Sequence, residues 1–168
     1  MKLVAIDLGK IKAGVAVFDE QGALLGARTV RIEAKTDVYV PEDMAVAMVE
    51  AARGLGGVER MQFIVEKPQK YKDKRNRHKD LDDLLAVEKM LRLACRRAKV
   101  PFKALRPAAW KGQVPKHIHA TRIRALLTEE EGKKMPEEHD AVDAVGIGLF
   151  VLKRAGLGGV PIAASRLR

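Results

Sequence analysis

The stretch Leu3-Val-Ala-Ile-Asp7, followed by Gly14-Val-Ala-Val-Phe18, decides the fold. Each stretch contains a short apolar run of the kind that forms a strand, and each run gives way to an aspartate. Residues 19–22 have the composition of a turn, and residues 23–30 are predicted to form a third strand. The first thirty residues therefore predict an antiparallel meander.

After residue 40 the pattern alternates between helix and strand. Apolar residues recur at helical spacing in the longer segments, and short apolar runs separate them. The expected order is a helix from Pro41 to the glycines at 54–57, a strand at Met61–Val65, a helix at Asp80–Ala98, a strand at Pro101–Leu105, a turn or first helical turn at Pro107–Trp110, a basic helix at His119–Leu127 and a buried last helix over 142–150.

The composition excludes several classes of protein. The chain has 168 residues, 47% of them hydrophobic and 32% charged, which is typical of a soluble globular protein. The single cysteine, Cys95, excludes an internal disulfide framework and a CxxC-type zinc site. The longest apolar run outside the N-terminus, Ala144–Leu152, is too short to span a bilayer. We therefore expect one domain over 1–155 with a loose tail over 156–168, no membrane partner, and a cytoplasmic location.

Positive charge is concentrated in the middle of the chain. The net charge is +10, but residues 67–128 hold 18 Lys and Arg against 5 Asp and Glu, a net charge of +13. Residues 67–79, which we call the basic segment, carry seven Lys and Arg and one acid. Residues 89–128 contain no acid at all. A basic face of this kind favours nucleic acid as the partner, although a solvated basic surface would have the same composition.

Carboxylates stand where apolar strands end and where the last helix begins. Asp7 and Glu66 each follow a predicted strand, and Asp140 and Asp143 lie three residues apart, on one face of a helix. If the two strands are parallel neighbours, the four acids converge, and a divalent cation would offset their repulsion. A strand-end Asp is more often a turn residue, and Asp140 could serve only the helix N-terminus. Asp143 has apolar neighbours on both sides, so burying it without a partner would be costly.

A cluster of this kind suits metal-assisted hydrolysis of a phosphodiester. Two ions about 3.5 to 4 Å apart would activate the attacking water and stabilise the leaving oxygen. Oxygen ligands favour Mg²⁺ or Mn²⁺ over Zn²⁺. The sequence therefore predicts Mg²⁺ as cofactor, with Mn²⁺ as a substitute and two ions in each site.

Five segments together resemble the RuvC-type Holliday junction resolvases, which have the RNase H-like fold. The resemblance covers residues 2–154, and it depends on the order and spacing of the segments more than on any one of them. They are Val4-Ala-Ile-Asp-Leu-Gly9, Gly14-Val-Ala-Val17, Phe63-Ile-Val-Glu66, Leu105-Arg-Pro-Ala-Ala-Trp-Lys-Gly112 and Asp140-Ala-Val-Asp-Ala-Val-Gly-Ile-Gly-Leu149.

The resemblance implies an α/β fold with a mixed five-stranded sheet, the first three strands antiparallel, flanked by helices. It also implies a homodimer that binds four-way junction DNA and nicks two strands of like polarity with Mg²⁺. The metal-binding and catalytic acids of the family fall on Asp7, Glu66, Asp140 and Asp143. Whether a branch-migration motor is a partner stays open. So does a phage or bacterial origin, although the compact chain and residues 107–112 resemble phage-encoded members.

Two positions depart from the family pattern. The aromatic residue that often disturbs base stacking three positions after the strand-end Glu is Gln69 here, and Tyr71 is a weak substitute. The acid Asp140 stands where some relatives have His, which leaves the adjacent His139 as a supporting residue, a general base or a plain exposed side chain. The residues expected to contact DNA are Lys67, Lys70, Tyr71, Lys72, Lys74, Arg75, Arg77, Lys111 and Lys116.

Other residues keep more than one interpretation. Trp110 is expected to be a packing residue, and His117 and His119 to be surface or phosphate-contacting residues. The leucines at 81, 84, 85 and 91 belong either to the core or to a dimer interface. Alternative functions are an RNase H-like nuclease for branched DNA or structured RNA, and a junction-binding protein without catalysis. An actin-like nucleotide-binding fold would need a second phosphate loop, which this chain lacks.

Lys-to-Ala substitutions in the basic segment should weaken DNA binding, because they remove groups that bind phosphates. The slope of log K against log salt concentration should fall by about 1 unit for each lysine that no longer meets a phosphate. Binding titrations over a range of salt concentrations measure this slope. A slope that stays unchanged after several such substitutions would remove the segment from the interface.

Overall fold

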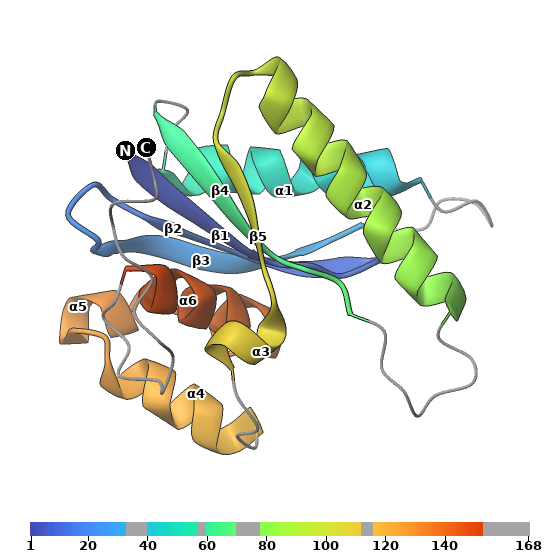
Figure 1. The fold of residues 1–168 in the computed structure, drawn as a ribbon. Coiled ribbons are helices and arrows are strands. Elements are labelled where there is room, and N and C mark those ends of the chain that lie inside the picture. The colour runs from blue at the N-terminus through green and yellow to red at the C-terminus, as the bar shows by residue number, and fades with distance from the viewer. Residues whose placement is uncertain (33–39, 57–59, 70–77, 112–115, 153–168) are drawn as a thin grey trace.

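A five-stranded sheet lies between two groups of helices (Figure 1). The structure is a computed structural model that describes residues 1–32, 40–56, 60–69, 78–111 and 116–152. The strands are β1 (Lys2–Asp7), β2 (Lys12–Phe18), β3 (Leu24–Arg31), β4 (Met61–Glu66) and β5 (Phe102–Leu105). The helices are α1 (Pro41–Gly56), α2 (His78–Arg97), α3 (Pro107–Trp110), α4 (Lys116–Ala125), α5 (Glu129–Gly132) and α6 (His139–Val151).

The sheet is mixed, as the sequence predicts. The strand order is β3-β2-β1-β4-β5. The first three strands pair antiparallel, whereas β4 lies parallel to β1 and β5 lies parallel to β4. Strands β1 and β4 therefore end at the same edge of the sheet, at Asp7 and Glu66. This confirms the expected α/β architecture.

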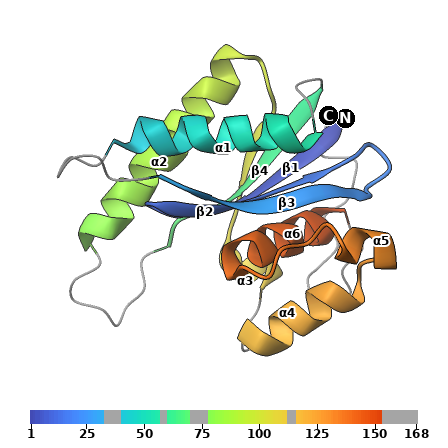
Figure 2. The ribbon, with the colours of Figure 1, turned by 180° about the vertical axis from the view of Figure 1, so that it is seen from behind.

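Helices cover both faces of the sheet, which explains why β1 is apolar at consecutive positions. Val4 and Ile6 point to the face covered by α1 and α2, and Leu3 and Ala5 point to the face covered by α6. Figure 2 shows the same arrangement from behind, with α1 and α2 on one side of the sheet and α3 to α6 on the other. Because successive strand residues alternate between faces, Asp7 shares the α6 side with Leu3 and Ala5.

The largest differences from the predicted helices concern α4 and α5. Helix α4 begins at Lys116, three residues before the predicted start, and ends at Ala125. Helix α5 is absent from the prediction, because a single turn is too short to show helical periodicity. Its N-terminus nevertheless carries a capping box, in which the Thr128 side chain accepts from Glu131 N–H and the Glu131 side chain accepts from Thr128 N–H.

Helix α6 approaches the sheet very closely at its first turn. A Cβ atom on Gly14 would lie 1.8 Å from the Asp140 carbonyl oxygen, so any larger residue there would push the helix away. Only glycine at this point of β2 allows the start of α6 to contact the strand backbone. Asp140 is thereby fixed beside the sheet edge at which β1 ends.

None of the helices in the described part of the chain is long and apolar enough to cross a membrane.

Glu131 joins α5 to the sheet from a buried position. Its Oε1 accepts the Leu24 N–H of β3 at 2.8 Å, and its Oε2 accepts the Thr128 N–H at 2.9 Å. The Lys134 ammonium donates to the Leu24 carbonyl oxygen at 3.2 Å. Both carboxylate oxygens therefore satisfy backbone donors that would otherwise be left without a partner.

Replacing this carboxylate should destabilise the protein. Glu131→Ala leaves the Leu24 and Thr128 N–H groups without their acceptor, and we expect the free energy of unfolding to fall by about 2 kcal/mol. Urea denaturation at pH 7 measures the change. The matched control is Glu130→Ala on the same short helix, whose side chain is 76% exposed and should matter by less than about 0.5 kcal/mol. Equal effects of the two substitutions would contradict this role of Glu131.

Candidate active site

Three separate segments bring the four predicted acids to the same edge of the sheet. Asp7 is the last residue of β1 and lies opposite Gly14 in the antiparallel pair of β1 and β2. The Asp140 backbone lies against that same Gly14, so the start of α6 stands next to the end of β1. Glu66 ends the neighbouring parallel strand, on the same face of the sheet. We call Asp7, Glu66, Asp140 and Asp143 the acid cluster.

The carboxylates interact electrostatically. Burial raises the pKa of Asp7 well above its usual range, and the charges of Glu66, Asp143 and Asp140 raise it further, against the opposing charge of Lys111. Burial also raises the pKa of Glu66, which Lys111 and a hydrogen bond from Trp110 partly offset. Ionised acids at this edge of the sheet therefore repel one another at a free-energy cost.

Two lysines supply positive charge to the acid cluster. The Lys111 ammonium, which follows α3, donates to Asp143 Oδ2 in a short ion pair. Burial alone would lower the pKa of Lys111, but the hydrogen bond and charge of Asp143, with the charges of Asp7 and Glu66, raise it overall. Lys12 of β2 places its ammonium 2.5 Å from Asp140 Oδ2. Both lysines therefore contact carboxylates directly.

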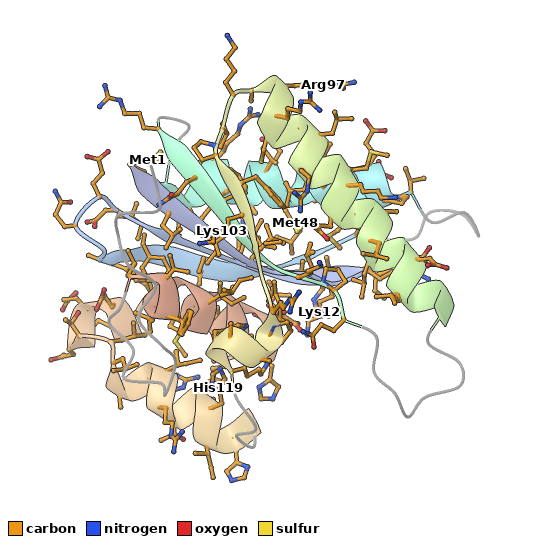
Figure 3. The ribbon with its side chains drawn as sticks, viewed as in Figure 1. Met1, Lys12, Met48, Arg97, Lys103 and His119 are labelled. Carbon is orange, nitrogen blue, oxygen red and sulfur yellow. The ribbon has the colours of Figure 1, made fainter. Side chains whose placement is uncertain are left out.

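Trp110 and His119 are buried rings next to Glu66 and Asp143. The Trp110 indole Nε1 donates to Glu66 Oε2 at 2.8 Å, and its ring centroid lies 5.0 Å from that of His119. His119 Nε2 lies 3.8 Å from Asp143 Oδ1, and burial lowers the pKa of this imidazole. In Figure 3 the labelled His119 lies beside α3, in agreement with its ring contact with Trp110.

The structure contradicts the prediction for His119 and agrees with the prediction for His117. His119 is only 2% exposed, so the expectation of a surface or phosphate-contacting residue is wrong. Because α4 begins at Lys116, His119 and Ile123 share the helix face that packs on α6. His117 is exposed, as expected. Trp110 is buried at 1% exposure, which confirms its packing role and adds a polar one.

The structure describes only some of the remaining predicted residues. His139, the first residue of α6, is exposed. Lys67 is exposed directly after β4, and Leu91 belongs to the core. Lys116 begins α4, but its side chain lies outside the described part of the chain. Outside the described residues altogether are Lys70, Tyr71, Lys72, Lys74, Arg75 and Arg77.

Sequence reasoning missed three charged residues near this site. Lys12 could have been noticed from its position in the sequence, because it lies between Asp7, which ends β1, and Gly14, which contacts α6. Its pairing with Asp140 depends on the packing of a distant helix. Arg122 and Arg124 are exposed on α4, the helix that carries His119. They belong to the long stretch without acids, whose composition was the available signal.

One further contact ties the loop after β1 to a distant helix. The Lys10 ammonium, three residues beyond Asp7, lies 2.5 Å from Asp83 Oδ2 in the second turn of α2. The connection between β1 and β2 is therefore attached to the helix that follows the basic segment.

The side chains of the acid cluster are of the type that binds a divalent cation such as Mg²⁺. All four side chains offer only carboxylate oxygens, and the raised pKa of Asp7 reflects burial and mutual repulsion that such a cation would relieve. Within the described ranges, no three His, Cys, Asp or Glu side chains stand close enough together to hold a metal ion in the present arrangement. Lys111 and Lys12 instead neutralise Asp143 and Asp140.

Comparison with known proteins identifies the fold. No protein-family model matches the sequence, and neither does any curated protein. Among solved structures, RuvC of T. thermophilus in complex with a Holliday junction substrate matches at a TM-score of 0.67 and 21% identity, over 94% of this chain and 96% of that one. A second structure of Thermus thermophilus RuvC matches at 0.63 and 21%, over 94% and 97% of the two chains.

The fowlpox virus Holliday junction resolvase is also similar, at a TM-score of 0.57 and 12% identity, over 91% of this chain and 98% of that one. Each of the three likenesses extends over nearly the full length of both chains. The chain therefore has the fold of the RuvC-type Holliday junction resolvases.

Proposed function

We propose that this protein is a structure-selective endodeoxyribonuclease that resolves four-way DNA junctions by metal-dependent hydrolysis of phosphodiesters. The observation that carries the proposal is the acid cluster, which stands at the ends of two parallel strands in a fold shared with RuvC over 94% of the chain. One of these RuvC structures contains a Holliday junction substrate. Four acids that repel one another are an unfavourable arrangement unless they serve a cation.

Each part of the site has a task in this reaction. Asp7, Glu66, Asp140 and Asp143 would hold Mg²⁺, or Mn²⁺ in its place, and we keep two ions for each site as our proposal. When bound, the metal would polarise the scissile phosphate and lower the pKa of a water. The Lys111 ammonium is held in its charged form within the acid cluster, so it could contact a phosphate oxygen of the strand brought there.

Phosphate binding would extend over basic residues on both sides of the acid cluster. Lys67 is exposed directly after Glu66 and begins the basic segment, and Arg122 and Arg124 are exposed on α4. Contacts of this kind hold the backbone of a nucleic acid without reading its sequence. The surface therefore suits a substrate that is selected by its shape.

Symmetric nicking of a junction needs two active sites, so a homodimer is part of the proposal. Helix α2 exposes Met90 and Leu93, and helix α1 exposes Val46. These side chains line a groove between the two helices. Exposed apolar surface of this kind is what a second copy of the chain would cover.

Asp7→Asn should abolish cleavage, because it removes the acid that interacts with the other three. Junction binding should persist, since Lys and Arg hold the phosphates. The test compares cleavage of a four-way DNA junction, a DNA flap and a hairpin RNA in Mg²⁺, together with gel shifts in Mg²⁺-free buffer. The control is Glu137→Gln, which removes an exposed carboxylate.

We expect the wild type and the control to cut the four-way junction preferentially, and Asp7→Asn to bind it without cutting. Cleavage retained in Asp7→Asn would overturn the site. Equal cleavage of all three substrates would indicate a less selective nuclease. Preference for the RNA would indicate an RNA-directed nuclease, and either result would contradict the resolvase function. Binding without cleavage by the wild type would indicate a junction-binding protein.

The same substitution should stabilise the metal-free protein. Because the native pKa of Asp7 lies above its unfolded value, the native state binds more protons between the two values. Stability therefore falls as the pH rises through that window, and the penalty is greatest above the native pKa. Asp7→Asn removes this penalty, and we expect a gain of about 1 kcal/mol in the free energy of unfolding at pH 7 in EDTA.

Urea denaturation of the wild type, Asp7→Asn and Glu137→Gln measures this gain. A decrease in stability for Asp7→Asn would show that the carboxylate is favourably held, which contradicts a repulsive cluster.

A further inference from the structure

Trp110 and His119 are in tilted ring contact, and each lies next to one of the four acids. They are 1% and 2% exposed, their ring centroids are 5.0 Å apart, and their planes make an angle of 57°. Trp110 ends α3, and His119 lies in the first turns of α4. We call these two residues the ring pair.

Each ring reaches a different acid. Trp110 Nε1 donates to Glu66 Oε2 at 2.8 Å, and His119 Nε2 lies 3.8 Å from Asp143 Oδ1. Glu66 belongs to β4 and Asp143 to α6. The ring pair therefore connects two acids that come from separate elements of the fold.

The surrounding packing fixes the orientation of the rings. A Cβ atom on Gly146 would lie 2.6 Å from Ile123 Cδ1 and 2.8 Å from Trp110 Cζ3. Helix α6 therefore lets the indole lie directly on its backbone, three residues beyond Asp143. Close packing on this helix restrains the indole in the orientation that points its N–H at Glu66.

The hydrogen-bonding capacities of the two rings differ. An indole N–H can only donate, so Trp110 occupies one oxygen of Glu66 and leaves Oε1 outside that bond. His119 Nε2 is buried without a hydrogen-bond partner, which is costly in a protein interior. It faces Asp143 Oδ1, whereas Lys111 holds the other oxygen, Oδ2. A small movement of Asp143 would close this gap into a hydrogen bond.

We infer that the ring pair positions Glu66 and Asp143 to receive a divalent cation. Trp110 orients the Glu66 carboxylate through Oε2 and keeps Oε1 available, and His119 takes Asp143 Oδ1 when Lys111 releases Oδ2. Buried donors of this kind orient the carboxylates that ligate metals, and their loss typically costs about 10- to 100-fold in affinity. The inference rests on the proposed metal-dependent function, and it makes both residues positioning residues that do not contact the substrate.

The chain has one tryptophan, so its intrinsic tryptophan emission reports on the ring pair alone. A cation bound by Glu66 changes the electric field at the indole that donates to this carboxylate, so the tryptophan emission of the protein should shift with it. This gives a readout of cation binding that does not require DNA cleavage.

The test is calorimetric titration of the DNA-free protein with Ca²⁺. Trp110→Phe keeps an aromatic ring and removes the donor, so its affinity should fall at least about tenfold. His119→Phe should behave in the same way, whereas His119→Gln keeps a donor and should recover part of the loss. The matched control is Ile123→Val, which alters the same packing against Gly146 and touches neither acid, and its affinity should equal that of the wild type.

The second readout is the emission of Trp110 in the wild type during the same titration. We expect a shift that saturates together with the heat signal. Unchanged Ca²⁺ affinity in Trp110→Phe and His119→Phe overturns the inference. If Trp110→Phe does not fold, the wild-type emission decides, and a constant emission at calorimetric saturation overturns the inference. A wild type that binds neither Ca²⁺ nor Mg²⁺ overturns the metal-dependent function as well, so the two failures are distinguishable.

Discussion

The site depends on one close contact, between the backbone of β2 at Gly14 and the first turn of α6. Because Gly14 has no side chain, the Asp140 carbonyl can lie where a Cβ atom would otherwise be. Gly14 also pairs with Asp7, so this one contact sets the separation between the acid that ends β1 and the acids that open α6. The parallel pairing of β1 and β4 then adds Glu66 from the other side. A larger residue at position 14 would push α6 away from the sheet, and Asp140 and Asp143 would then move away from Asp7.

The cluster also shows how a fold tolerates charges that oppose its own stability. Four carboxylates are gathered at one edge of the sheet, and burial and repulsion disfavour the ionised forms of Asp7 and Glu66. Lys111 and Lys12 offset part of that cost with ion pairs that are half-buried and separate from each other. These lysines neutralise Asp143 and Asp140, so a bound cation would compete with them for the same carboxylate oxygens. Stability and readiness to bind are thus set by the same few side chains.

Much of this was predictable from the sequence, and the exceptions have a common cause. The five strands and the larger helices follow from runs and periods of apolar residues, and Asp7 and Glu66 follow from strand ends. The errors concern contacts that arise only when distant segments meet. His119 has the neighbours of a surface residue, and its burial depends on how α4 packs on α6. The pairing of Lys12 with Asp140 joins residues 128 positions apart, which no local pattern encodes. Helix α5 is too short for periodicity to reveal, and only its capping box marks it.

The ion pair between Lys10 and Asp83 joins the loop after β1 to α2, the helix that follows the basic segment. The segment starts at the residue after Glu66, and it leads into α2, whose Asp83 binds Lys10 in the loop beyond Asp7. Strand β1 is thus joined to α2 by a side-chain ion pair and to β4 by parallel backbone pairing. The loop next to Asp7 is therefore held from outside its own pair of strands, by a residue 73 positions further along the chain.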